Sequence, residues 1–138
     1  MEDRKVLLTK LEKNLLLVIR KLRRELNDVF GETITRQEFT FLKMLYQKEP
    51  QMVSSLAKEL EVTASYATAV TDKLLQKGYV NRQRSAKDRR IVELSITDEG
   101  TELMNDMIKK KDAYMIESFG KLSDDEIKMM TMLIKKLR

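Results

Sequence analysis

Apolar residues recur at spacings of three and four along the first thirty residues of the chain. The stripe consists of Leu7, Leu11, Leu15, Val18, Leu22, Leu26 and Val29. Such spacing places the side chains on one face of a long helix, which we expect to run from about Arg4 to Phe30, where Gly31 breaks it. A single domain of 138 residues has limited core to cover a stripe of this length. We therefore expect part of the stripe to face a second subunit.

Two pairs of polar residues mark the starts of later helices. Thr35 with Glu38, and Ser123 with Glu126, have the spacing of a capping box, in which each side chain satisfies the other residue's backbone N–H. Pro50 is expected to stop the helix that begins after Thr35. The second capping box predicts a final short helix.

Two helices separated by a tight turn are expected in the middle of the chain. A short helix is predicted over residues 54–60, and the three residues 61–63 lead into a longer helix over residues 64–77. Thr63 suits the N-cap of the longer helix, and Gly78 suits the left-handed position that follows its end. This order is typical of a helix-turn-helix.

The hydrophobic period changes to two after the longer helix. The alternating apolar positions are Val92, Leu94 and Ile96. They predict a strand with one buried side, which residues 79–84 can join as a second strand, with residues 85–90 as a polar, basic loop between them. Thr97 then caps a long helix that reaches residue 117 or beyond.

The composition excludes several kinds of chemistry. The chain has no cysteine and no histidine, so thiol chemistry, imidazole bases and most transition-metal sites are ruled out, and we expect no metal and no cofactor. The carboxylate pair Asp124 and Asp125 falls in the first turn of a predicted helix, where the helix dipole explains it. No apolar run approaches the ~20 residues of a membrane span, and the N-terminus is charged. We therefore expect a cytoplasmic protein that is not an enzyme.

The positive charge of the chain is concentrated in one region. The net charge is +5, and residues 63–96 carry seven Lys or Arg against three Asp or Glu. The segments before and after this region carry net charges of +2 and −1. A local basic patch is the electrostatic footprint of a polyanionic partner, although many proteins carry such a patch without one.

A helix-turn-helix followed by a basic hairpin presents its second helix to the major groove of DNA. If Ala67, Val70 and Leu74 face the core, the first half of helix 64–77 turns small and hydroxylic side chains outward. Small residues let a helix approach base edges, and hydroxyl groups can bond bases or phosphates. On an isolated helix they would be ordinary surface residues. The candidate DNA-contacting residues of this helix are Thr63, Ser65, Tyr66, Thr68, Ala69, Asp72 and Lys73.

The hairpin loop carries the stronger signal for DNA. A basic hairpin tip can place an arginine in the minor groove, where the negative potential is concentrated. Asp88 can pair with Arg90 and hold its guanidinium group in position. The alternative is a solvated surface loop without a partner. The candidate DNA-contacting residues of the hairpin are Arg82, Arg84, Lys87, Asp88, Arg89 and Arg90.

These features together resemble the MarR family of bacterial transcriptional regulators. The resemblance rests on SLAKEL at 55–60, VTDKL at 70–74, KGYV at 77–80 and, most specifically, DRRIVELSITDEG at 88–100. The last segment is similar to the family's wing signature, D-R-R followed by L-x-L-T-x-x-G, and the likeness covers essentially the whole chain. A departure is Ala69, an outward position that is often arginine in the family. We therefore expect modest direct base readout, with minor-groove width and phosphate contacts carrying more of the specificity.

The resemblance implies a mainly helical winged helix-turn-helix fold, with four helices, a two-stranded hairpin and two further helices in one domain. Residues 35–97 would form the DNA-binding region, with 64–77 as the recognition helix and 85–90 as the wing. Residues 1–30 and 98–138 would intertwine two subunits into a homodimer. Such a dimer would regulate transcription, most often as a repressor, by reading a pseudo-palindromic operator in double-stranded DNA.

Family members also commonly bind small phenolic or lipophilic ligands between the dimerisation helices and the winged region. The resemblance therefore implies such a ligand as one means of releasing DNA, and Arg90 as the residue that enters the minor groove. Methionine suits an adaptable apolar pocket, but it is also ordinary interface filler, and we favour the interface. The methionines concerned are Met104, Met107, Met115, Met129, Met130 and Met132. Control by a protein partner or without a ligand stays open.

Other interpretations use the same features. A helical adaptor would use the long helices without DNA, which leaves the basic loop unexplained, and an architectural protein would bind DNA without reading a sequence. An enzyme would need a base or nucleophile constellation that the residue types do not supply. Membrane association of the first helix is disfavoured because its charges are mixed in sign.

Overall fold

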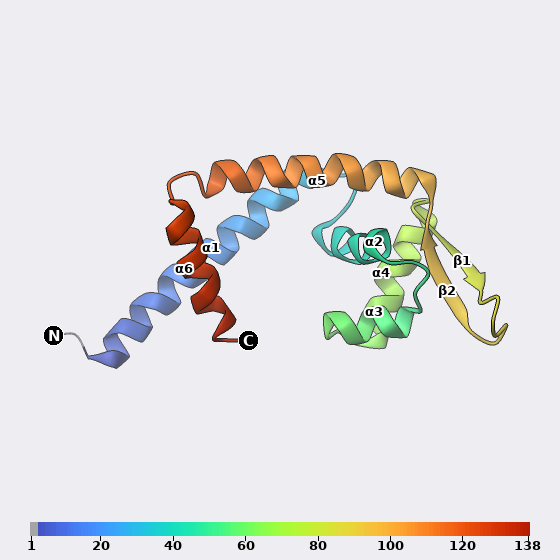
Figure 1. Ribbon diagram of the computed structural model, residues 1–138, viewed down its shortest axis with the longest axis horizontal. Coiled ribbons are helices and arrows are strands. Elements are labelled where there is room, and N and C mark those ends of the chain that lie inside the picture. The colour runs from blue at the N-terminus through green and yellow to red at the C-terminus, as the bar shows by residue number, and fades with distance from the viewer. Residues whose placement is uncertain (1–2) are drawn as a thin grey trace.

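The computed structural model describes residues 3–138 and has the predicted order of elements (Figure 1). Its helices and strands are α1 (Arg4–Phe30), α2 (Arg36–Gln47), α3 (Val53–Leu60), α4 (Ala64–Gln76), β1 (Val80–Arg84), β2 (Val92–Ile96), α5 (Asp98–Ser118) and α6 (Asp124–Lys135). The predicted fold class, mainly helical with one two-stranded hairpin, is confirmed, and the predicted boundaries agree to within a few residues.

The predicted helix caps are present. At the start of α2, Thr35 N lies 2.8 Å from Glu38 Oε1 and Glu38 N lies 3.0 Å from Thr35 Oγ1, which completes the capping box. Ser123 and Glu126 form the same reciprocal pair at the start of α6. Gly78 follows α4 with a φ of 81°, a left-handed conformation that favours glycine. Local sequence therefore determines where these helices begin and end.

The hydrophobic core lies where α2, α3, α4 and the hairpin meet the first half of α5. Its completely buried members come from each of these elements and are Leu42, Leu45, Leu56, Ala67, Leu74, Leu94 and Met104. Burying a leucine side chain stabilises a fold by about 1.5–3 kcal/mol relative to leaving it exposed. The core face predicted for α4 is confirmed, because Ala67, Val70 and Leu74 are all buried.

Strands β1 and β2 pair in antiparallel fashion, with Arg84 opposite Val92. The prediction of one buried side is wrong at the tip of the hairpin, since Leu94 is completely buried but Val92 is 39% exposed. The reason is that the hairpin extends beyond the body of the domain (Figure 1). Gln51 adds a further antiparallel bridge to Leu94, with Gln51 N 3.0 Å from Leu94 O and Leu94 N 2.7 Å from Gln51 O. The sequence pattern did not predict this bridge.

A tight joint connects the hairpin to α5. The Thr97 hydroxyl accepts a hydrogen bond from Gly100 N at 3.0 Å and donates one to Gly78 O at 2.8 Å. A Cβ at position 100 would collide with the carbonyl oxygen of Tyr79, so this close approach requires glycine. The joint thereby fixes the direction in which α5 leaves the hairpin.

The molecule is elongated, and α5 connects the core region to an end formed by α1 and α6 (Figure 1). Helix α1 packs on α5, where the Tyr114 hydroxyl donates a hydrogen bond to Glu25 Oε2 at 2.8 Å. Helix α6 has no buried residue. Large exposed apolar side chains of α1 and α6 include Leu7, Leu11, Leu15, Val18, Ile127, Met130 and Ile134. Within residues 3–138, no helix has the length and apolar character needed to cross a bilayer.

Candidate DNA interface

The exposed face of α4 carries most of the residues predicted for the recognition helix. Thr63 caps this helix, with its hydroxyl oxygen 3.1 Å from Tyr66 N. Because the opposite face is anchored in the core, the helical period turns the predicted residues outward. The exposed members are Thr63, Ser65, Tyr66, Thr68, Ala69 and Lys73. Tyr66 also packs within the chain, since its ring centroid lies 6.1 Å from that of Phe41.

Asp72 differs from the other predicted residues of α4 because its carboxylate already has a partner. Arg82 Nη2 lies 2.9 Å from Asp72 Oδ1, and each of these side chains is 48% exposed. The pair joins α4 to β1 and neutralises the negative charge of Asp72 on the exposed side of α4. An exposed ion pair contributes only about 0–1 kcal/mol to stability, so its main effect is to orient the Arg82 guanidinium group.

The predicted pair between Asp88 and Arg90 is present in the hairpin loop. Arg90 Nε lies 3.0 Å from Asp88 Oδ1, Arg90 Nη2 lies 3.0 Å from Asp88 Oδ2, and the backbone N of Arg90 also lies 3.0 Å from Oδ1. These hydrogen bonds hold the pKa of Asp88 below its ordinary value and raise the pKa of Arg90. The Arg90 side chain is 91% exposed. A charged guanidinium group is thus held in a fixed orientation at the surface.

The remaining loop residues shape the hairpin tip. Arg84 Nη1 lies 2.8 Å from the carbonyl oxygen of Arg89, so this cation is partly used within the loop. The Ser85 hydroxyl oxygen accepts hydrogen bonds from the backbone N–H groups of Lys87 and Asp88, at 3.2 Å and 3.4 Å. Lys87 and Arg89 are exposed. The predicted residues of the hairpin and of α4 come from separate elements, which the Asp72–Arg82 pair connects.

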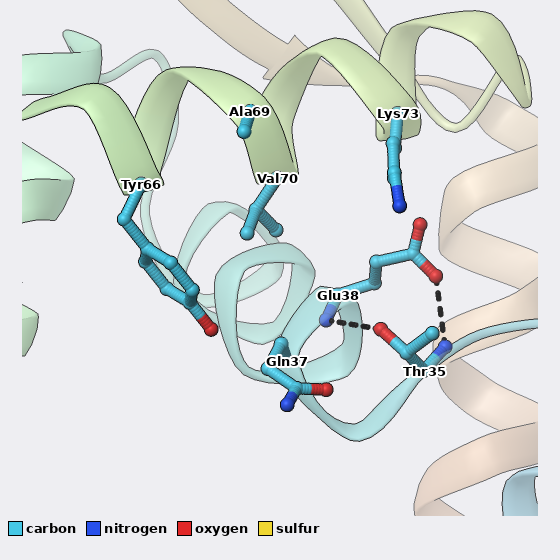
Figure 2. Close-up of a pocket in the computed structure, with 7 residues that line it drawn as sticks. All are labelled: Thr35, Gln37, Glu38, Tyr66, Ala69, Val70 and Lys73. Atoms are coloured by element: carbon cyan, nitrogen blue, oxygen red, sulfur yellow. Dashed lines mark hydrogen bonds between the residues drawn. The ribbon is translucent and has the colours of Figure 1, made fainter.

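A pocket of about 330 Å³ lies between α2 and α4, next to the predicted recognition residues (Figure 2). Its walls are formed by Thr35, Gln37, Glu38, Tyr66, Ala69, Val70 and Lys73. Glu38 is only 2% exposed, and Lys77 Nζ lies 2.7 Å from Glu38 Oε1. Burial raises the pKa of Glu38, but its hydrogen bonds with Lys77 and Thr35 and the charge of Lys77 outweigh burial and lower that pKa below its ordinary value of 4.5.

The sequence pattern identified Glu38 only as half of a capping box. Glu38 is also the ion-pair partner of Lys77, which lies 39 positions away in the chain. Helical and strand periodicity cannot predict a contact between residues so far apart. A signal existed in the position of Lys77 directly before Gly78, at the end of the predicted recognition helix. The position of Lys77 shows that a cation lies at the C-terminal end of α4, but it does not show which element that cation contacts.

The fold and the exposed faces of α4 and the hairpin define a winged helix-turn-helix protein. Among solved structures, the chain is similar to a mutant of MarR from E. coli complexed with operator DNA, with a TM-score of 0.84 and 25% identity. The similarity covers 99% of each chain.

Sequence comparison agrees with the structural likeness. A family model described as the MarR family matches residues 34–92. An uncharacterized HTH-type transcriptional regulator, YpoP from Bacillus subtilis (strain 168), is 37% identical over 87% of this chain and 85% of its own. The transcriptional repressor MdtR from the same strain is 30% identical over 75% of this chain and 67% of its own.

The chain belongs to the MarR family of transcriptional regulators. The family resemblance expected from residues 55–60, 70–80 and 88–100 is therefore confirmed. The expectation that the protein is a transcriptional regulator and not an enzyme is confirmed as well.

Proposed function

We propose that this protein represses transcription in the cytoplasm by binding a pseudo-palindromic operator in double-stranded DNA as a homodimer. The observation that carries the proposal is Arg90, whose exposed guanidinium group is held by Asp88. A guanidinium group fixed in this way suits the narrow, negative minor groove. The small exposed residues of α4, such as Ser65 and Ala69, suit a close approach to base edges in the major groove. The MarR structure with operator DNA and the repressor MdtR support the same function.

The homodimer is supported by the apolar surface of α1 and α6. Leu11 and Leu15 on α1 are 56% and 46% exposed, and Met129 and Ile134 on α6 are each 53% exposed. Monomeric proteins rarely leave extended apolar patches in contact with water. Most of the stability of a protein helix comes from packing of its apolar face, and α6 buries none of its residues within one chain. A second copy of the chain, packed through α1 and α6, would cover both surfaces.

Release of DNA by a small phenolic or lipophilic ligand is a further part of the proposal. The methionines give it no separate support, because Met104 and Met107 are buried in the core while Met115 and Met129 are exposed on helices α5 and α6. A panel of phenols would test it by thermal shift and by operator affinity. A phenol that raises the melting temperature and weakens operator binding would support ligand control.

The experiment that tests the proposed function is selection from a pool of random DNA duplexes at two salt concentrations. We expect enrichment of a pseudo-palindrome, with affinity that falls steeply as salt rises because bound cations displace counterions from phosphates. Salt-sensitive binding without an enriched sequence would indicate an architectural DNA-binding protein. The absence of binding at both salt concentrations would favour the helical adaptor.

A further inference from the structure

Glu38 is an unusual residue in this fold because it carries a charge at a buried position. Its Oε1 atom accepts hydrogen bonds from Thr35 N at 2.8 Å and from Lys77 Nζ at 2.7 Å. Its Oε2 atom is buried and has no hydrogen-bond partner among the described residues. Buried charges are costly unless they are paired. The carboxylate is therefore compensated by one cation, Lys77, and by the Thr35 N–H group.

The Lys77 ammonium group connects three parts of the chain. Lys77 is the C-cap of α4, Glu38 lies in the first turn of α2, and the carbonyl oxygen of Thr33 lies 3.4 Å from Lys77 Nζ. Thr33 belongs to the short link between α1 and α2. The ion pair thus fastens the end of α4 to the segment that continues directly from α1.

This attachment restricts how α4 can move relative to α1. A rotation or slide of α4 that separated Lys77 from Glu38 would leave a buried carboxylate without its cation. A second ion pair, between Asp72 of α4 and Arg82 of β1, is half exposed and tolerates separation at low cost. The Lys77 side chain is 35% exposed, but its partner Glu38 is buried, so separating this pair costs more than separating Asp72 from Arg82.

Resting on the proposed homodimer, we propose that the Glu38–Lys77 ion pair sets the distance between DNA half-sites that the protein reads. In a two-fold dimer joined through α1, the orientation of α4 relative to α1 determines the separation of the two recognition helices. That separation must match the spacing of the half-sites along the duplex. Glu38 and Lys77 act here as positioning residues, since their effect on DNA passes through the placement of α4.

The test uses variants that remove one charge and retain the rest of the local structure. Glu38→Gln keeps a side-chain oxygen for the capping box, because either glutamine or glutamate can occupy this position of the motif. Lys77→Met keeps most of the aliphatic stem and removes the ammonium group. Lys110→Met is the matched control, because it removes an exposed ion pair with Asp106 on α5, at 3.3 Å. Lys77→Arg restores a cation at the same position.

The measurement is the affinity of each protein for the selected operator and for operators whose half-sites lie one base pair closer or farther apart. Wild type and Lys110→Met are expected to show the same preference for the selected spacing. In Glu38→Gln and Lys77→Met the preference should fall by roughly twofold to thirtyfold, the range of couplings transmitted between sites through packed elements. Lys77→Arg should recover part of it. Circular dichroism and melting temperature establish that each variant is folded.

The results separate this inference from the proposed function. If wild type selects no pseudo-palindrome, the proposed homodimer that binds an operator is wrong, and the inference is overturned with it. If wild type prefers one spacing and Glu38→Gln and Lys77→Met retain the full preference, the ion pair is merely structural and only the inference is wrong. A loss of stability without a change in spacing preference has the same meaning. Should Glu38→Gln fail to fold, the comparison of Lys77→Met with Lys77→Arg decides the question.

Discussion

The region around α4 and the end formed by α1 and α6 bury their apolar side chains in different ways. In the first, Leu56, Leu74 and Leu94 are completely buried by residues of the same chain. In the second, Leu11 and Leu15 are about half exposed, and α6 contains no buried residue. An extended exposed apolar surface of this kind marks an interaction site. The winged helix-turn-helix region, α2 to β2, therefore buries its apolar side chains within one chain, whereas the apolar surface of α1 and α6 is left for the second subunit that we propose.

The largest expected effect comes from making the same substitution in both regions. Leu74→Ala should lower the free energy of unfolding by about 2–5 kcal/mol, because it leaves a cavity in the core. Leu15→Ala should instead raise the dimer dissociation constant, because Leu15 is 46% exposed in the single chain. Denaturant unfolding and sedimentation equilibrium measure the two quantities. A Leu15 variant that associates as tightly as wild type would show that the α1 stripe is not the interface.

The next effect concerns DNA binding by the winged region. Arg90→Ala should weaken operator binding by about 1–3 kcal/mol and reduce the preference for operator over scrambled DNA. Lys73→Ala is the matched variant on α4, and it should weaken binding to both duplexes evenly, as expected for a phosphate contact. Fluorescence anisotropy with the two duplexes measures both affinities. Equal losses on operator and scrambled DNA for both variants would refute the distinction between the two residues.

The stability of the protein should depend on pH through the buried carboxylate of Glu38. The pKa of Glu38 is lower in the folded protein than its ordinary value of 4.5, so the carboxylate contributes stability above that value. This contribution is lost as the pH falls below 4.5 and through the lowered pKa of the folded state.

Glu38→Gln removes this contribution and leaves every other carboxylate in place. The free energy of unfolding of wild type should therefore fall more steeply with acid than that of the variant. Urea unfolding at a series of pH values from about 6 to about 3 gives both slopes. Parallel curves for the two proteins would contradict the assigned effect of Lys77 on Glu38.

The smallest expected effect comes from the exposed pair between α4 and β1. Asp72→Asn should change the free energy of unfolding by no more than about 1 kcal/mol, because both partners are half exposed. Its effect on operator affinity should be smaller than that of Arg90→Ala. A change in stability as large as that of Leu74→Ala would mean that the winged region depends on this surface pair as much as on its core.

The sequence predicted features that depend on residues close together in the chain. The capping boxes at Thr35 and Ser123 act over three residues, and the Asp88–Arg90 pair acts over two, so each was visible as a spacing. Helical periodicity likewise predicted the buried face of α4, because the side chains of one helix keep a fixed angular relation.

Contacts between distant elements could not be predicted in the same way. The Lys77–Glu38 pair and the bridge from Gln51 to Leu94 depend on how helices and strands pack, and periodicity identifies a buried face without naming the element that covers it. Exposure of Val92 depends on how far the hairpin projects from the core. The roles of the predicted DNA-contacting residues stay predictions for the same reason, since they depend on a partner outside the chain.

The central claim, a homodimer that reads DNA, is tested most directly by the mass of the complex on a selected operator duplex. Light scattering should give the mass of the duplex plus two chains of 16.2 kDa, and the free protein should have the mass of two chains. Disrupting one half-site should lower the affinity sharply without producing a stable complex of one chain. A complex with a single chain, formed equally well on one half-site, would contradict the account.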